Sequence, residues 1–150
     1  MLTVTVESKA VTDMLSTLLK RLGDLKPAMA GIGQELESRV SARFETETDP
    51  LGQSWAPWAP STAANYPADG NRRLLDRYGD MLSSLNHRAD SDSVRVGFGS
   101  PIATFHEWGT VTMPRRGLLT ADPDAGTLAP ADEAAVLGIL NSFIEDGRQS

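Results

Sequence analysis

His106 and Glu107 are adjacent in the sequence, and together they raise the question of a metal site. The helical zinc motif of metalloproteases needs a second histidine four residues after the first, and that position is Thr110. The chain has two histidines and no cysteine, which leaves few nitrogen ligands and no thiolates for a transition metal. The sequence therefore predicts no metal site. A small metal-dependent hydrolase using His106, Glu107 and His87 is kept as a rival hypothesis.

Other catalytic and cofactor-binding patterns do not occur in the sequence. None of the serines lies on the sharp, glycine-flanked turn that exposes a nucleophile. Gly97-Phe98-Gly99 lacks the third glycine and the following long helix of a dinucleotide site. The chain has 20 acidic residues, but sequence alone places no two of them at a catalytic separation. We therefore predict no catalytic residue, no cofactor and no enzymatic activity.

Arg115 and Arg116 follow Met113-Pro114 and form a basic pair that is a candidate binding site. Guanidinium groups bind carboxylates and phosphates in a bidentate geometry, so this pair could hold an anion or the carboxylates of a partner. A plain surface role for both residues is the open alternative. A DNA-associated assembly factor is the third functional hypothesis, and it predicts binding that weakens steeply with salt.

Charge and composition limit the classes of protein. The chain has 150 residues and a formal net charge of −6, so as a whole it is repelled by a phosphate backbone, and sequence-specific DNA reading is not expected. Its length suits one domain with a hydrophobic core, and we expect residues 1–150 to form a single domain. The apolar runs are too short to cross a bilayer, and residues 1–7 lack the pattern of a secretory signal. We expect the protein to remain in the cytoplasm where it is made.

Hydrophobic periodicity predicts the long elements that would position these residues. Alternation over residues 2–7 predicts a strand, and apolar residues at helical spacing predict one helix over 11–25 and another over 27–44. Pro130 opens a final amphipathic helix that Gly147 ends, with Asp132 and Glu133 in its first turn.

A long loop is predicted over residues 45–73, with one helical turn at 61–66. It carries Trp55 and Trp58 between prolines, and their large apolar rings must be buried against something. Both rings could attach the loop to the helices of the same chain. Trp58 has fewer apolar neighbours in sequence, so it could instead contact a neighbouring subunit.

Shorter elements fill the rest of the chain. We expect a helix over 80–85, a hairpin whose arms are 87–89 and 93–98, a helix over 102–108 and a brief strand over 111–113. Residues 113–129 are expected to be irregular. The fold class predicted is α+β, with a small antiparallel sheet packed against two long amphipathic helices, plus short helices and a C-terminal helix.

Several motifs in a fixed order resemble the phage virion morphogenesis family. They are the helix end Arg39–Phe44, the loop Asp49–Pro57, the blocks Leu74-Leu75, Gly79–Leu85 and Val94–Gly97, then Ala103–Gly109 and Pro114–Leu119. The similarity covers about residues 32–119. The chain departs from the family pattern in having Trp108 before Gly109.

The resemblance implies a structural, non-enzymatic protein of a tailed phage, needed late in assembly to complete the tail or join it to the filled head at the neck. Proteins of this kind resemble ring-formers, so the implied partners are copies of the chain itself in a six-fold ring, neighbouring connector, neck or tail proteins, and DNA only as passing cargo. A tail terminator capping the tail tube is the closest alternative. No membrane role is implied. The candidate interface residues are Trp55, Trp58, Tyr66, His106, Trp108, Arg115 and Arg116.

Overall fold

The computed structural model describes residues 8–22 and 24–149. Within them the fold is α+β, as the sequence predicts, and the strand expected over residues 2–7 lies outside the described residues. The helices are α1 (Lys9–Leu22), α2 (Lys26–Thr46), α3 (Pro60–Ala64), α4 (Asp80–Ser83), α5 (Ile102–Trp108) and α6 (Pro130–Gln149), and the strands are β1 (Leu85–Ala89) and β2 (Val94–Phe98).

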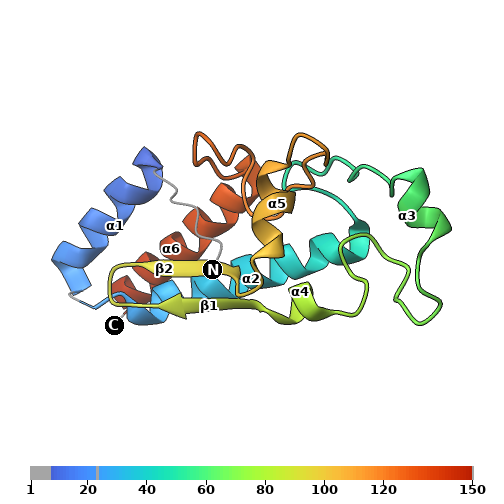
Figure 1. Ribbon diagram of the computed structural model, residues 1–150. Helices are drawn as coiled ribbons and strands as arrows, with labels where there is room; N and C mark the ends of the chain where they lie inside the picture. The colour runs from blue at the N-terminus through green and yellow to red at the C-terminus, as the bar shows by residue number, and fades with distance from the viewer. Residues whose placement is uncertain (1–7, 23, 150) are drawn as a thin grey trace.

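Helix α2 is the axis on which the other elements are built. Proline in its first turn suits the helix start, where no intrahelical N–H partner is lost. The helix ends at Thr46, and the residue that caps it, Glu47, has a left-handed backbone. The strands pair antiparallel from Leu85↔Phe98 to Ala89↔Val94. Both strands and α6 pack against α2, while α3 lies at the end of the molecule opposite α1 (Figure 1).

Two of the shorter elements differ from the sequence prediction. The helix expected over 80–85 ends at Ser83, because Leu85 already pairs with Phe98 in the hairpin. The strand expected over 111–113 is wrong: Thr110 and Met113 exchange backbone hydrogen bonds of 3.0 and 3.3 Å with each other. Those two bonds close a tight turn, so the segment has no partner strand, although its residue types favour extended structure.

The core has two clusters, one at each end of α2. Near its C-terminal end, Val40 and Phe44 pack with Trp55, Phe98 and Leu118, and the ring centroids of Phe44 and Trp55 are 5.6 Å apart, edge to face. The second cluster surrounds the N-terminal half of α2 and is made of Leu18, Leu25, Ala28, Met29, Ile32, Val136 and Leu140. The first cluster is the one that anchors the loops described below.

A buried ionic group connects α2, α6 and the loop before α6. The Asp132 side chain is 1% exposed and accepts hydrogen bonds from Arg43 Nη2 and, at 2.8 Å, from Arg39 Nε. Arg43 Nη1 also donates to the carbonyl oxygen of Leu118 at 2.7 Å. Burying these charges is costly unless each finds a partner, so the ion pair fixes which turn of α2 faces the start of α6.

Replacing Asp132 should test this arrangement. Asp132→Ala leaves the Arg43 guanidinium buried without its carboxylate, and we expect a loss of about 3–5 kcal/mol in the free energy of unfolding, measured by urea denaturation. Asp13→Ala is the control, because Asp13 forms an exposed pair with Lys9, and such pairs contribute less than about 1 kcal/mol. Equal losses in the two variants would contradict this role for Asp132.

Candidate partner-binding site

Glu107 lies on the inward side of α5 and is completely buried. Its carboxylate accepts hydrogen bonds from the backbone N–H groups of Leu118, Leu119 and Thr120 at 2.7, 2.9 and 3.0 Å, and from the Thr120 hydroxyl at 2.6 Å. The segment it holds has no regular secondary structure. The Glu107 carboxylate therefore accepts hydrogen bonds from backbone N–H groups that, in a strand or helix, would bond to backbone carbonyl groups.

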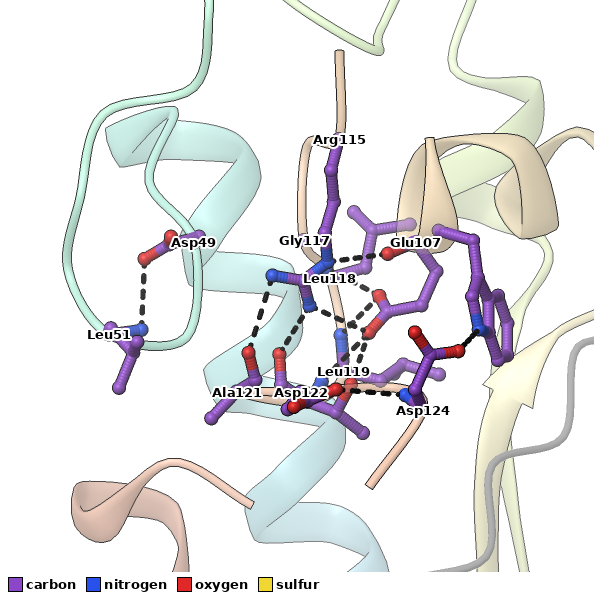
Figure 2. A network of polar contacts seen from close by, with 12 residues as sticks. Asp49, Leu51, Glu107, Arg115, Gly117, Leu118, Leu119, Ala121, Asp122 and Asp124 are labelled. Carbon is purple, nitrogen blue, oxygen red and sulfur yellow. Dashed lines mark hydrogen bonds and ion pairs between the residues drawn. The ribbon is translucent and has the colours of Figure 1, made fainter. Parts of the chain in front are cut away.

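Arg115 completes this network from the other side (Figure 2). Its Nη2 lies 3.3 Å from Glu107 Oε1 and donates to the Thr120 carbonyl oxygen at 2.7 Å, while its Nε donates to the Glu107 carbonyl oxygen at 2.6 Å. The structure thus places this guanidinium on acceptors of its own chain, with about a quarter of the side chain still exposed, at 28%.

Arg116 attaches the long loop to α5. It is 8% exposed, and its Nε and Nη2 donate to the carbonyl oxygens of Ala56 and Pro57, both at 2.8 Å. Trp55 is 5% exposed and its indole N–H donates to the Gly117 carbonyl oxygen at 3.0 Å. The loop on either side of Ala56 is therefore fixed to the body of the subunit, and Trp55 belongs to the core.

Beyond this attachment, residues 57–78 form a projecting segment that we call the arm, with α3 inside it (Figure 1). Trp58 stacks on Tyr66 with ring centroids 4.5 Å apart and an interplanar angle of 27°. The guanidinium carbons of Arg72 and Arg77 lie 5.5 and 5.4 Å from the centroid of the Tyr66 ring. Such contacts let a cation rest on an aromatic face without a carboxylate partner.

A cleft of about 690 Å³, which we call the arm cleft, lies between the arm, the start of α4, α5 and the segment 112–116. Its walls combine aromatic and aliphatic side chains with arginines, and they include Trp58, Tyr66, Leu75, Arg77, Tyr78 and His106. A concave, largely apolar surface with a few charged groups is typical of a binding site. Trp58, Tyr66 and His106, all expected as interface residues, thus lie together.

His106 lines this cleft and is partly buried. Its Nδ1 is buried without a hydrogen-bond partner among the described residues. Burial and the nearby Arg116 guanidinium lower the pKa of His106 to about 4, so the imidazole is neutral at pH 7.

Trp108 lies apart from the arm cleft. It is 37% exposed and its indole N–H donates to Asp124 Oδ1 at 3.1 Å. Phe105, one turn earlier on α5, is 52% exposed. The expected interface residues are therefore divided among the core, the arm cleft and this second exposed face.

The family model for the phage virion morphogenesis family matches residues 6–145, nearly the whole chain. The chain belongs to this family. No curated protein and no solved structure matches it. Membership in a virion morphogenesis family indicates a structural role in a phage particle, and no helix of the described residues is long and apolar enough to span a membrane.

The hydrolase hypothesis fits the structure of this virion protein poorly. The Glu107 carboxylate is enclosed by donors of its own chain, and His87 Nδ1 pairs with Glu37 on α2. Within the part of the chain that the structure describes, no group of three histidine, aspartate or glutamate side chains could hold a metal ion. Two of the three residues of that hypothesis, Glu107 and His87, are thus engaged with partners in their own chain.

The sequence does not predict the roles of three residues in this region. Its pattern relates Glu107 only to His106, and it indicates no role for Arg72 or Arg77. One signal does point to the burial of Glu107. It follows Ala103 by four residues, so the two share one side of the short helix, and that side faces the core. Nothing in the local sequence shows that the two arginines converge on one ring.

Glu107→Gln should loosen the loop before α6. An amide in place of the carboxylate removes the charge and one acceptor oxygen, leaving buried donors unpaired at a cost of about 3 kcal/mol in the free energy of unfolding. Urea denaturation measures this loss. Glu145→Gln, an exposed position on α6, is the control and should change stability by less than about 0.5 kcal/mol.

His106 should make stability depend on pH. Its pKa is about 4 in the folded protein and near 6.5 when unfolded, so the unfolded chain binds the proton more tightly and stability is lost as pH falls from about 6.5 towards 4. Between pH 7 and pH 5 we expect the wild type to lose about 1 kcal/mol more than His106→Phe, since the side chain is only partly buried. Parallel pH profiles of the two proteins would disprove the assignment.

Proposed function

We propose that this protein completes the tail of a tailed phage and joins it to the filled head at the neck, by forming a ring of identical subunits. The observation that carries the proposal is the family match over residues 6–145. Two features of the molecule support the proposal: an arm beside an aromatic cleft, and exposed aromatic side chains on α5.

Self-association into a closed ring needs two different surfaces on each subunit, each meeting the other on a neighbouring copy. The long loop, which contains most of the arm, is a candidate for one of them, and the segment 114–128 for the other. A six-fold ring would match the symmetry expected of a tail. The net charge of −6 suits a channel wall past which DNA slides without binding.

The partners in the particle would be the connector, neck or tail proteins on either side of the ring. Aromatic side chains dominate the binding energy of such interfaces, and Trp58 and Trp108 are the exposed or half-exposed tryptophans available for them. Before assembly the protein would be found in the host cytoplasm.

A phage with a stop codon early in this gene should make filled heads and tails that do not join. Electron microscopy of the lysate would show both parts separately, and purified protein added to the lysate should restore infectious particles. Tails of abnormal length would instead favour the tail terminator, which sets where the tube ends. Normal numbers of intact virions from the mutant would contradict both functions.

A further inference from the structure

We propose that neighbouring copies join by docking the arm cleft of one subunit on a second, acidic surface of the next. This surface, the acidic face, consists of Phe105, Trp108, Asp122 and Asp124. The inference rests on the proposed function, because it specifies the contact through which the ring would form.

The arm carries two arginines that form no ion pair within the described chain: Arg77 lines the arm cleft, and Arg72 is exposed on the arm outside that lining. The cleft wall also contains the carboxylates of Asp76 and Asp80. Among the described residues, Arg73 pairs with Glu45 and Asp76, but neither Arg72 nor Arg77 forms an ion pair. Both are exposed and lie over the Tyr66 ring. Two guanidiniums beside an aromatic floor suit a partner that brings carboxylates and an apolar side chain together.

The acidic face offers that combination. Asp122 and Asp124 are exposed and form no ion pair within the described chain, and Asp124 is bound to the Trp108 indole. The Phe105 ring lies one helical turn from Trp108, so both rings share one side of α5. The charge of this face is therefore negative, opposite to that of Arg72 and Arg77 on the arm, and its aromatic rings are exposed.

The two surfaces lie on different sides of the same subunit. His106 lines the arm cleft, and Trp108 follows it by two residues, which on an α-helix is roughly 200° of rotation. The loop that leads into α6 lies on the side of α5 away from α3 (Figure 1). In a two-fold dimer both contacts would have to form between the same two copies, and surfaces on different sides of a subunit cannot both face one partner. They therefore favour a head-to-tail series of copies.

Charge reversal tests this contact directly. Arg72→Glu/Arg77→Glu makes the arm acidic, and Thr104→Lys/Asp124→Lys makes the opposite face basic, Thr104 being an exposed neighbour of Trp108 on α5. Each double variant alone should weaken self-association by roughly tenfold or more, because like charges then meet at the contact. An equimolar mixture of the two variants should recover assembly, since each acidic arm then meets a basic face. Native mass and sedimentation measure the oligomers.

Matched controls change the same charge elsewhere. Arg88→Glu/Arg95→Glu alters an exposed cross-strand pair of the hairpin, and Asp13→Lys/Thr17→Lys alters exposed positions of α1. Both should assemble as the wild type does, and circular dichroism checks that all variants fold.

The outcomes separate the contact from the function. If the wild type assembles and both charge-reversed variants assemble equally well, this contact is wrong while ring formation stands. A wild type that is monomeric at high concentration contradicts the contact and the ring alike. If the arm variant keeps its oligomeric state but loses binding to a DNA oligonucleotide or to inorganic phosphate, the arm is an anion site and the proposal is overturned.

Discussion

The buried carboxylate of Glu107 is the contact on which the exposed surfaces of this protein depend. Residues 115–121 have no helix or strand to hold them, and Glu107 pairs their backbone N–H groups instead. Because this segment is fixed, Arg116 is held where it can bind the carbonyl groups of Ala56 and Pro57. The position of the arm is therefore set, through a short series of hydrogen bonds, by one side chain of α5.

The Asp132 ion pair acts in the same way on the other side of that segment. Arg43 binds both Asp132 and the carbonyl oxygen of Leu118, so α2, α6 and the loop share one buried charged group. Buried ion pairs are weak contributors to net stability, because desolvation offsets most of the attraction. Here the ion pair acts mainly on specificity: it favours one arrangement of the loops, whereas apolar packing alone would allow several.

The sequence predicted the elements whose signal is local. Helical spacing gave α2 and α6 to within a few residues, and alternation around Asp90-Ser91-Asp92 gave the hairpin. It did not predict the contacts that arrange the loops, since Glu107 and Thr120 are 13 residues apart and Arg116 and Ala56 are 60 apart. Residue types at 111–113 favour a strand, but a strand also needs a partner, and that segment instead closes on itself through Thr110. Local sequence pattern therefore predicts helices and strands, but it does not predict which distant donor and acceptor form a hydrogen bond.

Fixing the arm before assembly has an energetic consequence for any ring that it helps to form. A loop that becomes ordered only on binding loses conformational entropy at that moment, and this reduces the affinity obtained from a given interface. Here the Trp58–Tyr66 stack, the guanidiniums over Tyr66 and the clamp by Arg116 are all formed within one subunit. The rings of the arm thus have a defined geometry in the single subunit, although most of the segment is irregular. Less conformational entropy would therefore be lost when the arm binds a partner. Net charge adds a second condition, because a chain that is negative overall repels its own copies at a distance. The contact that we propose between copies would therefore need local patches of the opposite sign, such as the one formed by Arg72 and Arg77.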